Sequence, residues 1–215
     1  MGSSTSNFDN SNCITNGPAT CDSLREFLQY DDKGNIVYYY RPQDNFMGRN
    51  MMNVHDMYDK EIGSIGRILG CSQITYNFYD EYKQLKYYIE EAKNCCTNNY
   101  TIYGTDKNII STITVKFGCS DVTFDEYDKY NTKTKGVIGK RDCSAKTTYY
   151  ENDQNGNPIF IIRQSYDCGR CKFKIYDQNE KEINLSDKTL FNDGFTNIQK
   201  ILILLIIFHA NPQNS

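Results

Sequence analysis

Cysteine is the residue type whose spacing comes nearest to a chemical motif in this sequence. Cys168 and Cys171 stand as Cys-Gly-Arg-Cys, a spacing that zinc sites and thiol redox sites share. Two thiolates are half of a structural zinc site. The other ligands would have to come from Cys95, Cys96, Cys119 or Cys143. A thioredoxin-type role needs a βαβ setting, which the surrounding short strands do not provide. We therefore expect neither a zinc site nor a redox centre here.

The side chains that usually carry hydrolytic catalysis show no matching pattern. His55 lies in a polar stretch and His209 follows an apolar run, and neither has a nucleophile and carboxylate spaced as in a triad. The sequence contains no paired carboxylate motif, no H-E-x-x-H and no G-x-S-x-G. We interpret both histidines as structural and predict that the protein is not an enzyme.

Residues 1–6 match the M-G-x-x-x-[ST] pattern for myristoylation, which makes Gly2 a lipidation candidate. The same letters also occur as a scar of expression vectors. A single myristoyl chain binds membranes only marginally and needs a second signal. Lys133, Lys135, Lys140 and Arg141 could supply that signal as a basic hairpin facing anionic lipid, and a solvated turn is the alternative reading.

The bulk composition narrows the class of protein. The 215 residues carry a net charge of −3, which argues against bulk nucleic acid as a partner. Nine cysteines without a signal peptide favour a reducing compartment and free thiols. The length fits one large domain, and we place it at residues 23–215 after a disordered tail at residues 1–22.

The N-terminal third has few regular signals. Residues 23–26 (SLRE) read as a capping box that opens a short helix through Leu24, Phe27 and Leu28. An aromatic strand follows at residues 36–40, and residues 43–60 read as an irregular excursion. Gly63, Gly66 and Gly70 do not complete a phosphate-binding loop, so we interpret them as turn glycines.

From residue 74 onward, short apolar-alternating segments and turn residues recur about every ten residues, the pattern of an antiparallel meander. The predicted strands are 74–79, 85–91, 100–104, 109–116, 122–127, 136–140, 146–151, 158–163, 172–176 and 182–185. Such a meander forms a sandwich or a closed barrel.

The apolar run from residue 201 to 208 needs burial on every side. It consists of Ile201, Leu202, Ile203, Leu204, Leu205, Ile206, Ile207 and Phe208. A membrane-spanning helix needs about twenty apolar residues, so this run is too short to cross alone. It belongs in a core or at a membrane interface. We favour a helix over residues 197–210 that is threaded through the barrel, where it would supply much of the core.

This order of features resembles the phospholipid scramblase family over residues 73–210. The segment YNFYDEYKQLKYYIEEAKNCCT at residues 76–97, with its Cys95-Cys96-Thr97 end, is the most specific match. The segments 100–119, 136–143 and 158–177 follow in the family's order. The resemblance implies a Tubby-like closed antiparallel β-barrel of about twelve strands around a hydrophobic C-terminal helix.

Several sequence features that are typical of the family are reduced or missing in this chain. Only Pro18 and Pro42 precede the barrel, so docking through a Pro-rich region is not supported. Cys119 alone stands where the family has a palmitoylated cysteine cluster. The family's proposed calcium segment corresponds to residues 186–195, which hold two carboxylates and an intervening lysine, whereas calcium takes six to eight oxygen ligands. We expect no tight calcium site and no other cofactor.

The resemblance implies a membrane-associated protein that binds phospholipids or moves them across the bilayer without ATP, at the cytoplasmic face of a membrane, in the first place the plasma membrane. A helix that forms the barrel core favours lipid binding over autonomous transport. The competing hypothesis is a soluble cytoplasmic barrel that acts as a protein-interaction or signalling module without a lipid role. The sequence names no protein partner.

Overall fold

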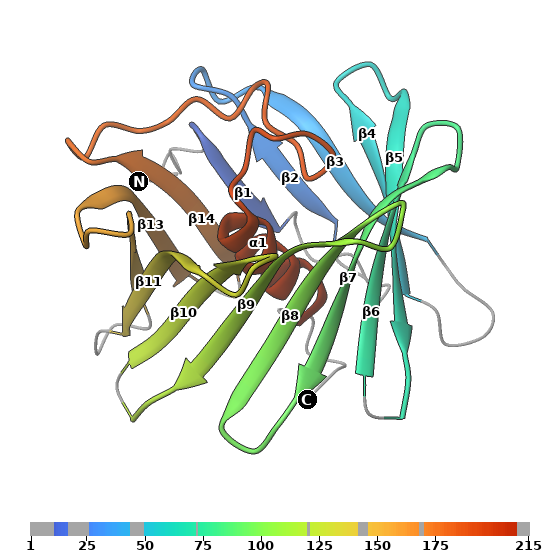
Figure 1. Cartoon of the computed structure of the whole chain (residues 1–215). Coiled ribbons are helices and arrows are strands. Elements are labelled where there is room, and N and C mark those ends of the chain that lie inside the picture. Colours follow the sequence, from blue (N-terminus) through green and yellow to red (C-terminus); the bar gives the residue numbers. More distant parts are fainter. Residues whose placement is uncertain are drawn as a thin grey trace.

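Consecutive antiparallel strands form a closed barrel around one helix in the computed structural model (Figure 1). It describes residues 11–16, 26–43, 50–71, 73–119, 121–141, 146–167 and 170–209. The strands in these ranges are β1 (Cys13–Asn16), β2 (Phe27–Tyr30), β3 (Ile36–Gln43), β4 (Asn50–Asp56), β5 (Glu61–Leu69), β6 (Gln73–Asp80), β7 (Leu85–Lys93), β8 (Thr97–Gly104), β9 (Ile109–Phe117), β10 (Asp121–Asp128), β11 (Lys133–Arg141), β12 (Thr147–Asn152), β13 (Pro158–Asp167) and β14 (Arg170–Asp177). The helix is α1 (Asn197–His209).

Apolar and polar side chains alternate along each strand, so that the barrel wall has an apolar inner face. In β6, Ile74, Tyr76 and Phe78 are buried, while the residues between them are partly exposed. This period of two matches the pleat of a strand with one buried face. Each strand pairs with its neighbours along the chain, and β1 closes the ring by pairing with β14.

Seven turns of one construction lie at one end of the barrel, which we call the aspartate end. In six of them the first residue is an aspartate whose Oδ1 accepts hydrogen bonds from the backbone N–H groups two and four positions later: Asp31, Asp56, Asp80, Asp128, Asp153 and Asp177. Gly104 has this position in the remaining turn, where Asp106 accepts from the Asn108 backbone. Such Asx turns explain why Asp and Asn crowd the separators between strands.

The fourth residue of every one of these turns has a positive φ. The values run from 60° at Lys83 to 85° at Gly156, and Asp59, Lys107 and Glu180 share this conformation. A type I turn followed by one left-handed residue is a common three-residue hairpin connection. Glycine suits the last position best, yet most of these turns place a residue with a side chain there.

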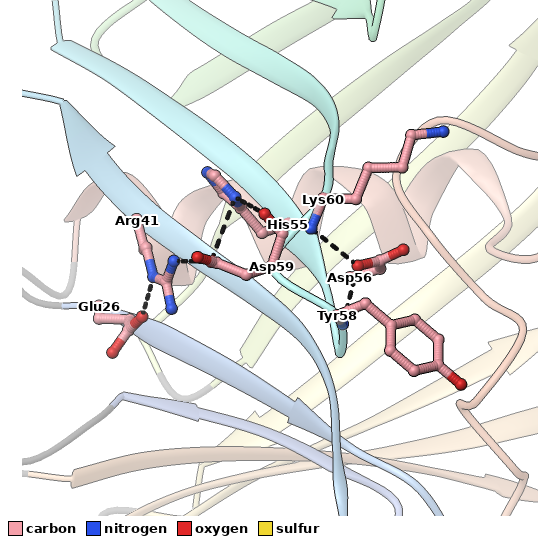
Figure 2. Close-up of polar contacts among 7 residues, drawn as sticks. All are labelled: Glu26, Arg41, His55, Asp56, Tyr58, Asp59 and Lys60. Atoms are coloured by element: carbon pink, nitrogen blue, oxygen red, sulfur yellow. Dashed lines mark hydrogen bonds and ion pairs between the residues drawn. The ribbon is translucent and has the colours of Figure 1, made fainter.

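Ion pairs and hydrogen bonds connect the turn between β4 and β5 to the neighbouring strand β3 (Figure 2). Asp56 accepts from the backbone of Tyr58 and Lys60. Arg41 of β3 reaches Glu26 at 2.8 Å and also pairs with Asp59. His55 lies beside Asp59, with 3.1 Å between its Nδ1 and the Asp59 carbonyl oxygen.

The structure confirms a closed antiparallel barrel around a C-terminal helix, with fourteen strands in the described ranges where about twelve were expected. The expected disordered tail is wrong for residues 13–16, because these form β1, and Ile14 of β1 enters the core. The expected helix through Phe27 and Leu28 is also wrong, since both residues belong to β2. Their neighbours β1 and β3 supply backbone partners, which outweighs a local capping pattern.

Two further segments differ from the sequence-based expectations. The excursion at residues 43–60 contains β4, whose Met52 and Val54 are buried, and Gly63 and Gly66 lie within β5. A Cβ on Gly63 would come within 2.9 Å of the Phe191 ring, so this glycine permits close packing and does not make a turn. The expected last strand at residues 182–185 is reduced to one bridge, between Glu182 and Tyr176.

Candidate functional site

The apolar run of α1 lies inside the barrel. Ile201, Leu202, Ile203, Leu204, Ile206, Ile207 and Phe208 are all buried, and Leu205 is partly exposed. Phe208 packs on Tyr76 of β6 with 5.6 Å between the ring centroids. Of the two environments that the sequence left open, the structure therefore has the barrel core.

Polar side chains of the wall hold the first turn of α1. Asn197 Nδ2 donates to Ser111 Oγ at 3.0 Å and to Glu126 Oε1 at 2.7 Å, and Gln199 Nε2 donates to Glu151 Oε2 at 2.9 Å. Glu126 and Glu151 are buried, and burial raises the pKa of the Glu151 carboxyl. Carboxyl groups beside a helix N-terminus interact favourably with the helix dipole.

The other end of α1 meets a buried cation. Arg67 of β5 is buried, and its guanidinium carbon lies 5.9 Å from the centroid of the Phe208 ring. Positive charge near a helix C-terminus also complements the dipole. Close by along the wall, Tyr76 donates to the buried Glu91 carboxylate at 2.8 Å. The wall thus has carboxyl groups at the N-terminal end of α1 and a guanidinium near its C-terminal end.

The structure separates the four basic residues that the sequence grouped as a lipid-facing hairpin. Lys133 lies 2.5 Å from Asp125, and Lys135 lies 3.9 Å from the buried Glu151. Lys140 is exposed near the opposite end of β11, about 24 Å from Lys133 at the rise of an extended strand. Arg141 ends β11, and its side chain lies outside the described residues. The described side chains of Lys133, Lys135 and Lys140 are therefore spread along β11 and do not form one compact cluster.

Lys140 instead joins a second group of cations on the outer wall. In the strand register Lys140 is opposite Thr148, Thr148 is opposite Arg163, and Arg163 is opposite Lys174. Lys172 lies two residues before Lys174 on β14, and Lys146 immediately precedes β12. We call this set the basic face: Lys140, Lys146, Arg163, Lys172 and Lys174.

A hollow of about 380 Å³ lies within the basic face. It is lined by Lys146, Thr148, Arg163, Gln164, Ser165, Lys172, Lys174 and Tyr176. Two carboxylates border it: Glu180 accepts from Arg163 at 2.9 Å and Glu182 accepts from Lys174 at 2.5 Å. Arg163 and Lys174 are directly opposite each other on neighbouring strands, and these two carboxylates compensate the repulsion between them.

The exposed cysteines gather at the end of the barrel opposite the aspartate end. Cys71, Cys95, Cys96 and Cys119 are free thiols in the connections that follow β5, β7 and β9. We call this the cysteine end. Exposed Leu69 and Phe117 flank these connections. Sequence order alone places these loops together, because successive connections of a meander alternate between its two ends.

A pocket of about 330 Å³ opens at the cysteine end. It is lined by Val115, Phe117, Gly118, Cys119, Asp121, Val122, Phe124, Gly139, Thr147, Tyr149, Gln164 and Leu205. Tyr149 donates to Gln164 Oε1 at 3.2 Å. A Cβ on Gly139 would lie 2.6 Å from the Tyr149 ring, so a glycine at this position makes room for the ring. Leu205 is partly exposed because it faces this pocket.

The expectations on metals concern other parts of the chain. Among the residues described, no group of three or more histidine, cysteine, aspartate or glutamate side chains is arranged to hold a metal ion. Cys168 lies outside the described residues, and Cys171 is buried. In the segment expected to correspond to the calcium site, Lys188 Nζ donates to the Gly194 carbonyl at 3.0 Å and Asn192 Nδ2 donates to the Asp187 carbonyl at 2.9 Å.

Two remaining candidates lie wholly or partly outside what the structure describes. These are Gly2 and the side chain of His209. His55 contacts Asp59 at the turn shown in Figure 2.

Sequence reasoning missed the basic face because it is assembled from four strands. Part of the signal was local: Lys172 and Lys174 alternate with Cys171, Phe173 and Ile175, so both lysines had to leave the barrel on the same side. The cross-strand register that adds Lys140 and Arg163 was not readable from the sequence.

Comparison with protein-family models gives no match for this chain, and comparison with curated proteins gives none either. In the described part of the chain no helix is both long and apolar enough to cross a membrane.

Proposed function

We propose that the protein binds anionic phospholipid at a membrane surface through the basic face. The observation that carries this proposal is the hollow of the basic face, which is lined by four cations: Lys146, Arg163, Lys172 and the buried Lys174. Two of these four pair with the bordering carboxylates Glu180 and Glu182. Each lysine or arginine near an anionic membrane contributes about 1 kcal/mol of attraction. The resemblance to phospholipid scramblases adds the expectation of a cytoplasmic membrane face, where anionic lipids are enriched.

The position of α1 inside the barrel favours binding of lipid over its transport. Placing α1 in a bilayer would remove Asn197 from Glu126, Gln199 from Glu151 and the Phe208 ring from Arg67. Two buried carboxyl groups would then lose hydrogen-bond donors, which is unfavourable. It would also remove the centre of the barrel core. We therefore propose a peripheral lipid-binding protein whose helix stays inside the barrel.

Vesicle flotation tests the proposal with charge-matched variants. The test protein is Lys140→Gln/Lys146→Gln/Lys172→Gln, and the control is Lys33→Gln/Lys86→Gln/Lys107→Gln, which removes three exposed lysines of the aspartate end. On vesicles containing phosphatidylserine, we expect partitioning of the test variant to fall by about 100-fold and that of the control to change little. Equal partitioning of both variants would overturn the proposed use of the basic face.

Gly2 needs a separate comparison in a cell that myristoylates proteins. If Gly2 carries the second membrane signal, Gly2→Ala should lower the membrane fraction further in combination with the basic-face variant. Recovery of wild type and of all variants in the cytosolic fraction would instead support the protein-interaction module.

A further inference from the structure

Exposed apolar and thiol side chains follow one another along part of the rim at the cysteine end. Going round the ring of strands, the connections β5–β6, β7–β8 and β9–β10 are consecutive at this end. Leu69 is 54 % exposed and Phe117 is 56 % exposed. The backbone N–H of Phe117 donates to the Cys96 carbonyl at 3.3 Å, which joins two of these connections. We call this set the apolar arc: Leu69, Cys71, Cys95, Cys96, Phe117 and Cys119.

The lysines of the basic face continue the same rim. Val122 of β10 is opposite Phe117 of β9 on one side, and on its other side it is opposite the residue before Lys140 on β11. At the spacing of paired strands, the backbones of Phe117 and Lys140 are therefore about 10 Å apart. The next connections round the ring lead to Lys146, just before β12, and to Lys172, near the start of β14. Apolar and cationic side chains thus lie on one continuous edge of the barrel.

The aspartate end has a different charge. It also exposes aromatic rings, because Tyr58, Tyr82 and Tyr130 lie in its turns and are 74 to 81 % exposed. However, six aspartates begin its turns, and further carboxylates such as Asp59 and Glu180 lie beside them, so that the lysines of this end are interspersed with negative charge. Anionic lipid repels such a surface, and exposed rings alone therefore do not make it a membrane contact.

The cysteine end has the opposite balance of charge among the described residues. Its exposed carboxylate Asp121 is opposite Lys140 in the strand register, and Lys146 and Lys172 add positive charge to the same rim. Lysines attract anionic lipid, and apolar side chains next to them can leave water on contact with a bilayer. The cysteine end is therefore the end of the barrel whose surface complements an anionic membrane.

We propose that the cysteine end enters the membrane surface, with Leu69 and Phe117 among the lipid headgroups and the lysines of the basic face on the lipid phosphates. The headgroup layer is about 5 to 7 Å deep, a depth that a phenylalanine side chain reaches from a backbone outside it. Aromatic rings are favoured at this level of a bilayer. This inference rests on the proposed function and adds the orientation of the barrel to it: the aspartate end points away from the membrane.

Tryptophan fluorescence tests the orientation, because the chain contains no tryptophan of its own. Phe117→Trp places a single reporter on the apolar arc, and Tyr82→Trp places one on the aspartate end; Leu69→Trp replaces the first if it fails to fold. The vesicles contain phosphatidylserine and a lipid brominated on its acyl chains. We expect the emission of Phe117→Trp to shift to shorter wavelength and to be quenched by bromine, while that of Tyr82→Trp does neither. Quenching of Tyr82→Trp, or no quenching of Phe117→Trp while the protein is bound, would overturn the orientation.

Removing the exposed apolar side chains provides the matching variant. Leu69→Ser/Phe117→Ser takes them from the cysteine end, and the control Tyr82→Ser/Ile110→Ser takes two exposed side chains from the aspartate end. Both variants keep every charge. We expect partitioning of the first onto phosphatidylserine vesicles to fall by at least about tenfold and that of the control to stay unchanged. Equal partitioning of the two folded variants would overturn the insertion of Leu69 and Phe117.

The two sets of assays separate the two proposals. Failure of the wild type to float, even on vesicles rich in phosphatidylserine, would overturn the proposed membrane binding itself. A wild type that floats and depends on the lysines of the basic face, but whose Phe117→Trp emission does not respond to brominated lipid, would overturn the inserted cysteine end and leave the membrane binding in place.

Discussion

At the scale of single residues, the turns of the aspartate end contain side chains in a backbone conformation that favours glycine. Lys107 has φ 62° and is exposed. The left-handed conformation costs a residue with a Cβ about 1 to 2 kcal/mol, and glycine avoids this cost. Part of that gain in stability is lost again, because glycine has more conformational freedom in the unfolded chain. We expect Lys107→Gly to raise the free energy of unfolding by about 0.5 to 1 kcal/mol, measured by urea denaturation.

The reverse change at the equivalent turn position is the control. Gly156 has φ 85°, and an added Cβ would meet no atom within 4 Å. Gly156→Ala should therefore lower stability by about 1 kcal/mol through backbone strain alone. A loss of stability in Lys107→Gly would contradict this account of the turns.

The buried carboxyl of Glu151 predicts a pH dependence of stability. Burial raises its pKa above the ordinary value of 4.5, so between that value and the raised one the folded state holds a proton that the unfolded state has released. Stability from this group is present below pH 4.5 and is lost as the pH rises through the folded pKa. Glu151→Gln should show a smaller loss of unfolding free energy on going from pH 4.5 to 7 than the wild type. Parallel pH profiles would contradict the assignment.

At the scale of elements, α1 is the centre of the core. Leu204 is 2 % exposed, and Leu204→Asp would bury a carboxylate without a partner. We expect the whole domain to lose more than about 3 kcal/mol of stability, seen as a large fall in melting temperature. Leu205→Asp is the matched control with a smaller loss, because Leu205 faces the pocket. An unchanged melt for Leu204→Asp would contradict a helix seated in the barrel.

The elements also show what the sequence could predict. Strands from β6 to β14 were foreseen within a few residues, because each combines a period of two with a strong turn. β1, β2, β4 and β5 were missed because their local signals are weak and their partners lie on neighbouring strands. The buried run of α1 was predicted from apolarity on all sides. The basic face was not predicted because it depends on cross-strand register. The pocket was not predicted because it depends on that register and on Gly139, which makes room for Tyr149.

At the scale of the whole molecule, the barrel depends on its shortest strands for closure. β1 has four residues and pairs with both β2 and β14. Without β1, those two strands would present unpaired edges, which promote self-association. A chain lacking residues 1–16 should melt at lower temperature and elute as larger species in size-exclusion chromatography than a chain lacking residues 1–10. Identical behaviour of the two truncations would show that β1 is dispensable.

The closed barrel also makes a prediction about lipid transport. Because α1 is held at both ends by wall residues, the reconstituted protein should not accelerate movement of fluorescent phospholipids between leaflets, with or without calcium. Dithionite quenching in proteoliposomes measures this directly. Accelerated quenching would show that the helix leaves the barrel and would return transport to the proposed function.

The order of elements along the chain has a consequence for synthesis. Every strand pair except β1 with β14 is between neighbours, so hairpins can form as the chain emerges from the ribosome. The helix that completes their core follows all the described strands along the chain. Until it emerges, the growing sheet has an apolar face and no centre, which is the condition under which nascent chains aggregate or recruit chaperones. We therefore expect cooperative folding of this protein to begin only after translation of α1, so that a ribosome stalled before residue 197 should hold a protease-sensitive chain.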